Sequence, residues 1–246
     1  MTYCVGLKID RGIVFASDTR TNAGVDNIAR FKKMKIWDNG SDRTLVLLSA
    51  GNLAVTQAVA TLLDEQLAAR EDGSQPTLYS VATMFQAARL VGAALRRVRE
   101  IEGEELGATA ESFSASFIMG GQIKGDEARL FQIYTEGNFI EAGPETPYFQ
   151  IGEHKYGKPI LDRVAVPTMR MGDAAKLVLL SFDSTLRSNL SVGLPIDIAI
   201  YRNDTYHIGE VERIEAEDDY FRDLSQAWSD ALRRAFDEIK GYPDEN

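Results

Sequence analysis

Short apolar runs separated by turns occupy the first fifty residues and return in the second half of the chain. The runs 2–9 and 12–18 flank Asp10-Arg11-Gly12 and predict a β-hairpin. The run 44–50 is apolar throughout, which predicts a strand buried on both faces. The same reasoning predicts strands at 31–37, 112–119, 130–134, 139–141, 148–152, 197–201 and 206–208, the last two as a hairpin.

Apolar positions at helical spacing predict a helix pair at 52–69 and 77–100, capped by Asn52 and Thr77. A second pair is predicted at 158–164 and 173–186, and an amphipathic helix at 220–239. Strand runs with helix pairs between them favour an α+β fold with two stacked sheets and helices outside, a four-layer αββα sandwich. The loops are expected at 19–27 and 102–111. We expect one domain over 1–246, with an acidic C-terminal helix at about 218–240 and a short tail at 241–246.

Composition narrows the possible functions. The chain has 246 residues and a net charge of −10, which argues against nucleic-acid binding. The acidic excess is concentrated at 210–223 and 237–246 and indicates a solvated helix face and a tail. The chain contains neither a run of about eighteen apolar residues nor a secretory signal pattern, so no membrane span is expected.

Cysteine and histidine content indicate a cytoplasmic protein without a metal or cofactor. The single cysteine, Cys4, excludes an internal disulfide and fits a reducing compartment; it is either a reactive thiol or a small core side chain. His154 and His207 lack Cys or carboxylate partners at ligand spacing, so both are expected to be structural or surface residues.

The N-terminus offers a candidate nucleophile. Met1 is followed by a small residue, Thr2, so its removal would expose a residue with a hydroxyl and an α-amine. That amine can act as the base for its own hydroxyl. The alternative is an ordinary edge strand that starts at residue 2.

Three further groups are expected near Thr2 because of the antiparallel order of the strands. Lys33 would lower the pKa of the Thr2 hydroxyl, and Asp18 would pair with Lys33. The amide of Gly51, beside a helix N-terminus, would bind the oxyanion. Arg20, just past the end of the second strand, is also expected near Thr2. The alternative is that Asp18, Lys33 and Arg20 form a surface charge cluster.

These residues carry a family resemblance. Thr2, the segments 12–21 and 31–33, and Ser49-Ala50-Gly51 resemble the β-subunits of proteasome-type threonine peptidases, and are more similar still to the bacterial relatives known as Anbu. The resemblance implies the N-terminal nucleophile hydrolase fold. It also implies that Thr2 is nucleophile and base, with Asp18, Lys33 and Gly51 in the other central roles.

The remaining site positions match the pattern of the family only in part. Asp183-Ser184 matches the Asp and Ser that complete the site in the family, with Ser188 close by, whereas Glu153 stands where the family usually has Ser. The lysine register leaves Lys32 and Lys35 as alternatives to Lys33. A mixed, partly basic substrate pocket is expected from four residues: Ala23, Phe31, Lys35 and Ser49.

The resulting hypothesis is a threonine peptidase that cleaves peptide or unfolded-protein substrates through an acyl-enzyme. The resemblance implies a homo-oligomeric ring or ring-like spiral, and it leaves an unfoldase partner unknown. Two alternatives stay open: an N-terminal nucleophile amidase that acts on small amides, and a catalytically silent scaffold or binding subunit. Glu153, and the dependence on Met1 removal, favour the second alternative.

Overall fold

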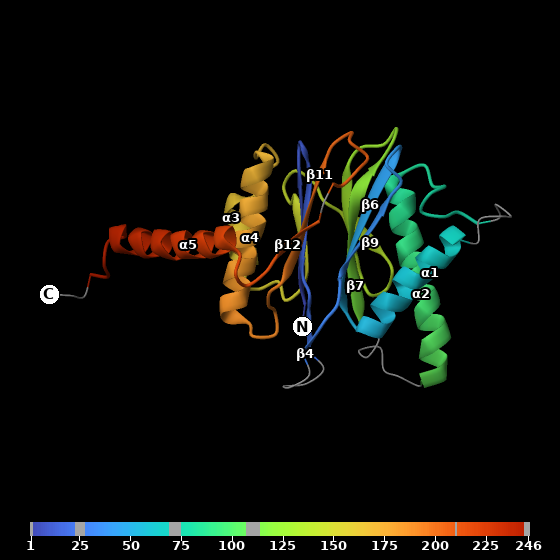
Figure 1. Ribbon diagram of the computed structural model, residues 1–246, viewed down its shortest axis with the longest axis horizontal. Coiled ribbons are helices and arrows are strands. Elements are labelled where there is room, and N and C mark those ends of the chain that lie inside the picture. The colour runs from blue at the N-terminus through green and yellow to red at the C-terminus, as the bar shows by residue number, and fades with distance from the viewer. Residues whose placement is uncertain (1, 23–27, 69–74, 107–113, 210, 244–246) are drawn as a thin grey trace.

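Two β-sheets stacked face to face, with helices on both outer sides, form four layers (Figure 1). The computed structural model describes residues 2–22, 28–68, 75–106, 114–209 and 211–243. The α+β class and the αββα layering predicted from the sequence are confirmed.

The first sheet has the strand order β10-β1-β2-β11-β12, and neighbouring strands are antiparallel. Its strands are β1 (Tyr3–Ile9), β2 (Gly12–Asp18), β10 (Tyr148–Gly152), β11 (Ile196–Arg202) and β12 (Glu212–Ile214). The second sheet, β5-β6-β7-β8-β9, is also antiparallel. Its strands are β5 (Met34–Asp38), β6 (Arg43–Gly51), β7 (Ala115–Ile123), β8 (Arg129–Ile133) and β9 (Phe139–Glu141). A small ribbon, β3 (Arg20–Asn22) with β4 (Ile28–Arg30), connects the two sheets.

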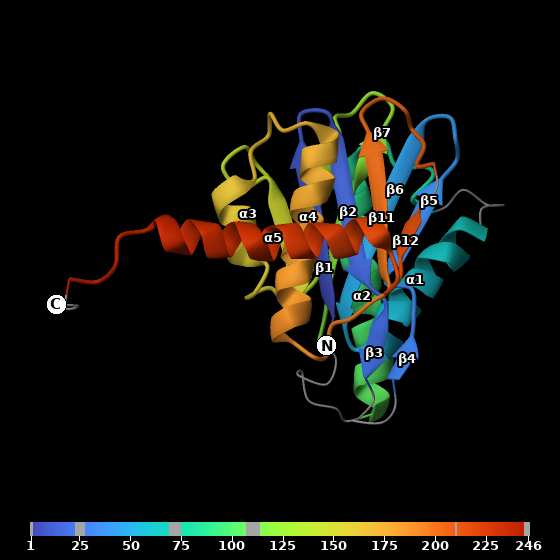
Figure 2. The same ribbon diagram turned by 60° about the vertical axis from the view of Figure 1, so that its left-hand side comes forward.

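The helices cover the two outer faces. The second sheet is covered by α1 (Leu53–Ala68) and α2 (Met84–Leu106), and the first by α3 (Lys158–Val164) and α4 (Met171–Ser188). The C-terminal helix α5 (Asp219–Glu238) crosses α4 and extends away from the layers (Figure 2). None of the helices in the described part of the chain is long and apolar enough to cross a membrane.

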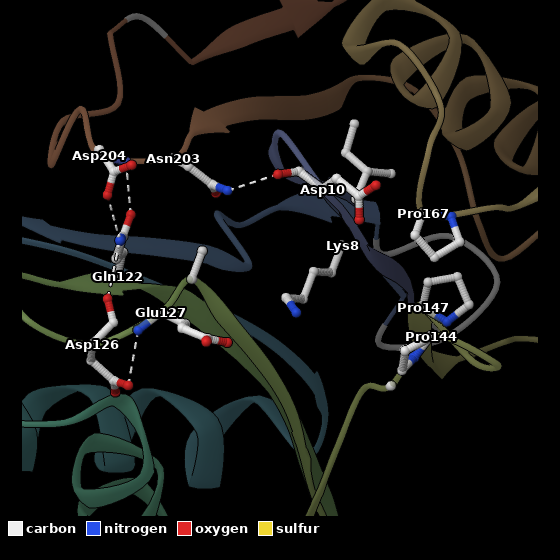
Figure 3. Close-up of a pocket in the computed structure, with 13 residues that line it drawn as sticks. Lys8, Asp10, Gln122, Asp126, Glu127, Pro144, Pro147, Pro167, Asn203 and Asp204 are labelled. Carbon is white, nitrogen blue, oxygen red and sulfur yellow. Dashed lines mark hydrogen bonds between the residues drawn. The ribbon is translucent and has the colours of Figure 1, made fainter.

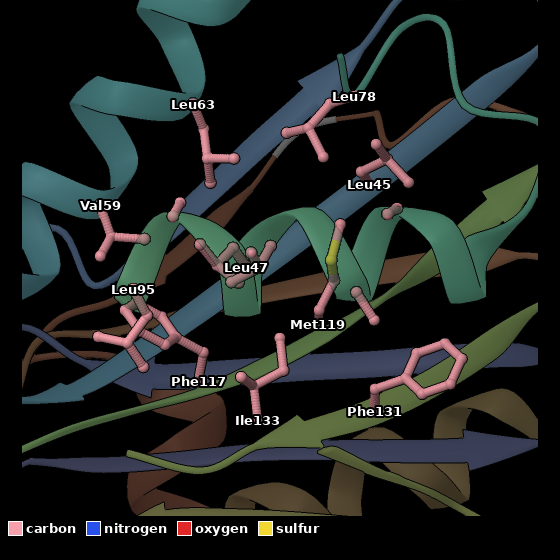
Figure 4. Packing of buried hydrophobic residues seen from close by; sticks show 14 of the residues in the cluster. Leu45, Leu47, Val59, Leu63, Leu78, Leu95, Phe117, Met119, Phe131 and Ile133 are labelled. Atoms are coloured by element: carbon pink, nitrogen blue, oxygen red, sulfur yellow. The ribbon is translucent and has the colours of Figure 1, made fainter. Parts of the chain in front are cut away.

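Alternating strand positions build three buried clusters. Between the sheets lie residues such as Cys4, Phe15 and Met34. Under α1 and α2, Leu45, Leu47, Phe117 and Met119 of the second sheet pack against Val59, Leu63 and Leu95 (Figure 4). The third cluster joins the first sheet to α3 and α4 through Tyr3, Val5 and Phe182. Strands β1 and β2 are buried on both faces because each contributes to two clusters.

Several secondary-structure predictions are wrong. The strand expected at 31–37 begins only at Met34, and the segment 19–27, expected as loop, contains β3. The hairpin expected at 197–208 instead pairs β11 with β12, and residues 206–208 are not a strand. The expected loop at 102–111 is still helix up to Leu106.

The second long helix begins at Met84 and not at Thr77. Thr83 Oγ1 accepts the N–H of Gln86, and Gln86 Oε1 accepts the N–H of Ala82, which is close to the Thr-x-x-Gln capping pattern. Asp126 adds a further acceptor for the N–H of Met84. Thr83-x-x-Gln86 was therefore the stronger start signal in the sequence.

Candidate active site

Asp18, the last residue of β2, binds groups from both sheets. Its Oδ1 accepts the backbone N–H of Tyr3 at 3.0 Å and the ammonium of Lys33 at 2.8 Å. Lys33 also donates to the carbonyl oxygen of Arg20 at 2.6 Å. Through Asp18, the Lys33 ammonium is therefore linked to the backbone N–H of Tyr3, the residue that directly follows Thr2.

This ion pair is buried. The Asp18 and Lys33 side chains are 0% and 5% exposed. Burial raises the pKa of the Asp18 carboxyl, and the Lys33 ammonium opposes that rise. Asp18 Oδ2 is buried without a hydrogen-bond partner among the described residues. A pair this deeply buried depends on both of its charges, because either one alone would lack compensation.

Lys33 is the lysine of the three candidates that contacts Asp18. Lys32 is exposed, and Lys35 pairs with Asp64 of α1 through a 2.6 Å contact between Nζ and Oδ2. Lys33 lies just before β5, and its carbonyl oxygen accepts the N–H of Ser49 at 3.0 Å. That bond continues the β5–β6 pairing and fixes the backbone of Lys33.

Thr2 is half-buried at the start of β1 and is held by the segment that follows β10. Its carbonyl oxygen accepts the N–H of Glu153 at 2.7 Å. Gly152 adopts φ +81°, and a Cβ at that position would lie 2.0 Å from the carbonyl oxygen of Thr2. Only glycine fits this close approach, so Gly152 is part of what positions Thr2.

Gly51 ends β6 directly before helix α1 and adopts φ +109°. The N–H of Ser49 points toward Lys33, and the N–H of Asn52 points the opposite way, toward the carbonyl oxygen of Ser114. Since N–H directions alternate along a strand, we expect the N–H of Gly51 on the Lys33 edge. Asn52 Oδ1 caps α1 by accepting the N–H of Ala54.

The three predicted residues of α4 lie on the helix that packs against β1. Asp183 is buried and pairs with Arg187 at 3.2 Å, Ser184 is half-buried, and Ser188 is exposed. The hydrogen bond between α4 and β1 comes from Ser181, whose Oγ accepts the hydroxyl of Tyr3 at 3.0 Å. Helix α4 is thus fixed beside β1 through a residue that the sequence did not indicate.

The predicted substrate pocket is described in part, because Ala23 lies outside the described residues. Phe31 is 38% exposed, and Ser49 is half-buried. Lys35 is compensated by Asp64, whose Oδ1 also accepts the Trp37 indole N–H at 2.8 Å. The charge of Lys35 is therefore paired, and the basic character expected for this pocket is reduced.

Sequence reasoning missed Asn189, which follows α4. Its side chain is mostly buried, and its Nδ2 donates to Glu153 Oε2 at 3.0 Å. An Asn directly after a helix is a common turn residue, so nothing in the residue pattern indicates that it reaches Glu153.

Cys4 lies close to the ion pair, but its surroundings do not suit a nucleophile. It is fully buried, and its thiol donates weakly to the Ser49 carbonyl oxygen at 3.5 Å. Burial raises the pKa of the Cys4 thiol, which keeps it protonated and poorly reactive. Of the two interpretations of Cys4, the structure supports the core side chain.

A cavity of about 440 Å³ lies at the other end of the sandwich (Figure 3). It is lined by Lys8 and Asp10 of the β1–β2 hairpin and by Glu127 and Asp204. Because β1 runs from Tyr3 to Ile9, this cavity is separated from Thr2 by roughly 20 Å of strand. Among the described residues, no group of three or more His, Cys, Asp or Glu side chains could hold a metal ion.

The αββα sandwich places this chain in the class of proteasome-type subunits. The family model for the proteasome subunit matches residues 2–201, and the chain belongs to that family. No curated protein matches the chain.

Solved structures of Anbu proteins cover nearly the whole chain. This chain is 59% identical to a Gly-1 mutant of Anbu from Hyphomicrobium sp. strain MC1, with a TM-score of 0.93 over 98% of this chain and 99% of the other. Anbu from Yersinia bercovieri, described as an ancestral beta-subunit, is 44% identical, with a TM-score of 0.90 over 99% and 100%. The helical assembly of the Anbu complex from Pseudomonas aeruginosa is 42% identical, with a TM-score of 0.90 over 98% of each chain.

Proposed function

We propose that this chain is a threonine-type peptidase of the cytoplasm whose nucleophile is Thr2 after removal of Met1. The observation that carries the proposal is the shared oxygen of Asp18, which binds both the Tyr3 amide and the Lys33 ammonium. It keeps a fixed positive charge beside the nucleophile's backbone, where an alkoxide would need stabilisation.

In the proposed reaction, the freed α-amine of Thr2 takes the proton of the Thr2 hydroxyl, and the oxygen attacks a peptide carbonyl carbon. Lys33 stabilises the alkoxide, and the Gly51 N–H donates to the developing oxyanion. The amine returns the proton to the leaving nitrogen, which leaves an ester on Thr2. Water then attacks the ester and releases the acid. Loss of one oxyanion donor raises such a barrier by about 2.7–4 kcal/mol.

Degradation of an unfolded protein tests the peptidase function. Incubation of the Met1-free protein with a reduced, unfolded polypeptide should yield short peptides that mass spectrometry detects, and Thr2→Ala should yield none. Hydrolysis of small amides with an intact polypeptide would favour the amidase function. Absence of any Thr2-dependent product would contradict both.

One observation favours the silent scaffold as a second candidate function. The segment beside Thr2 presents the Glu153 carboxylate, which is held by Asn189. A carboxylate there stabilises the protonated amine, and a protonated amine is no base. A scaffold would keep the assembly and show no Thr2-dependent chemistry at any pH.

Assembly into a homo-oligomer is part of the proposal. The relative from Pseudomonas aeruginosa is described as a helical assembly. In this chain, α5 carries an apolar stripe, defined here as Trp228, Leu232 and Phe236, whose distal members are exposed. Leu232 is 52% and Phe236 78% exposed. A stripe that extends beyond the body suits a head-to-tail contact, which gives a ring if it closes and a helix if it does not.

Replacement of the distal stripe should abolish assembly without unfolding the chain. Leu232 and Phe236 are exposed in the single chain, so Leu232→Ser with Phe236→Ser should leave its Tm unchanged. Native mass spectrometry should show small species in place of the assembly. Arg234→Ser, on the opposite face of α5, is the control and should keep the assembly. Equal masses for both variants would show that the stripe is not the contact.

A further inference from the structure

The backbone of Glu153 lies beside that of Thr2, just past the end of the β1–β10 pairing. The register ends at Tyr3 opposite Gly152, and the N–H of the next residue, Glu153, donates to the Thr2 carbonyl oxygen at 2.7 Å. Since N–H directions alternate along a strand, the Thr2 nitrogen lies on the β10 side of β1, where Glu153 also lies. The N–H of Tyr3 points the other way, to Asp18.

The Glu153 carboxylate is oriented by a buried partner. Asn189 is 8% exposed and donates to Glu153 Oε2, while its own Oδ1 accepts the N–H of Ser191. The Asn189 amide is thereby fixed by its own loop and determines which way the carboxylate points. A neutral amide supplies a hydrogen bond without compensating the negative charge.

A protonated Thr2 amine would supply a positive charge next to the Glu153 carboxylate. The Asp18–Lys33 pair on the β2 side is neutral overall, and so is the Asp183–Arg187 pair on α4. The Arg20 side chain lies against Gly193, in the loop after α4. Among the described residues of this group, Glu153 is the carboxylate without an ion-pair partner, and its N–H binds the Thr2 carbonyl oxygen.

We propose that Glu153, positioned by Asn189, pairs with the α-ammonium of Thr2 and holds the nucleophile in a resting, protonated state at neutral pH. The inference rests on the proposed function in one respect, which is that Met1 is removed so that Thr2 has a free amine. The site then becomes active as the pH rises and the amine loses its proton. Glu153 is a positioning residue in this scheme, because it acts on the substrate only through Thr2.

Periodate oxidation measures the protonation of this amine without any peptide hydrolysis. Periodate cleaves the Cα–Cβ bond of an N-terminal threonine and reacts through the free amine, so its rate against pH reports the amine pKa. The protein is used after intact mass shows that Met1 is absent, with methionine aminopeptidase treatment where it is retained. Rates are normalised to a threonyl peptide in the same buffer, whose amine titrates near pH ~8.

The wild-type amine should titrate above that of the peptide, and Glu153→Gln should lower its apparent pKa by about one pH unit. Asn189→Ala should shift it in the same direction by less, because the carboxylate remains but loses its orientation. Glu127→Gln, at the far end of the sandwich, removes the same charge and should change nothing. Coincident profiles for wild type and Glu153→Gln would overturn the inference. A Glu153-dependent shift in a protein without peptidase activity would uphold it while the proposed function fails.

Discussion

Lys33→Met should lower the free energy of unfolding at pH 7 by about 3–5 kcal/mol, because it leaves the buried Asp18 carboxylate without its cation. Urea unfolding followed by circular dichroism measures the loss. Lys32→Met is the matched control: Lys32 is exposed, so that change should stay within about 0.5 kcal/mol. Equal losses in the two variants would show that Lys33 compensates nothing.

The pH dependence of Lys33→Met follows from the direction of the Asp18 shift. Burial raises the pKa of Asp18 in the folded state, and loss of Lys33 removes the group that opposed the rise. The folded chain then binds a proton more readily than the unfolded chain, so stability falls as the pH rises through the raised pKa. We therefore expect the loss to shrink as the pH is lowered toward an ordinary carboxyl pKa near ~3.9. Asp18→Asn combined with Lys33→Met should recover part of the loss at neutral pH.

Gly152→Ala should reduce the reaction of Thr2 with an electrophile by about a hundredfold or more, a loss typical of a nucleophile displaced by roughly 1 Å. The added Cβ would lie 2.0 Å from the Thr2 carbonyl oxygen, so the backbone of Thr2 has to move. Rates of covalent labelling, measured by intact mass against time, test the prediction.

Gly125→Ala separates this displacement from backbone strain. Gly125 adopts φ +93°, close to the +81° of Gly152, but an added Cβ there meets no atom within 4 Å. We expect Gly125→Ala to cost about 1–2 kcal/mol of stability from its positive φ and to label at the wild-type rate. Similar labelling rates for the two alanine variants would mean that Gly152 does not position Thr2.

Much of the fold could be predicted because strand and helix periodicities are strong in this chain. The strands at 139–141 and 148–152 and the helix at 158–164 were predicted to the residue. The errors fall where tertiary contacts override local pattern. Met84 begins α2 with help from Asp126, which lies 42 residues away, and β11 takes β12 as its partner in place of the nearer segment 206–208.

In the candidate site, too, features set by strand order could be predicted, and contacts between distant elements could not. Strand order indicated that Asp18, at the end of β2, would meet a lysine near the start of β5, and the register left Lys32, Lys33 and Lys35 as candidates. Side-chain pairs between distant elements left no trace in the sequence. Asp64 pairs with Lys35 from a helix, and Asn189 reaches Glu153 across 36 residues. Such contacts depend on how helices pack on sheets, which residue spacing does not specify.

The most direct test of Thr2 as the nucleophile uses an electrophile that closes a ring on the hydroxyl and α-amine of an N-terminal threonine. Protein freed of Met1 is incubated with this reagent, and the adduct is located by peptide mass spectrometry. We expect a single adduct on Thr2, absent from Thr2→Ala and from any chain that retains Met1. A folded, Met1-free chain that stays unlabelled from neutral to alkaline pH, or that carries the adduct on another residue, would contradict the account.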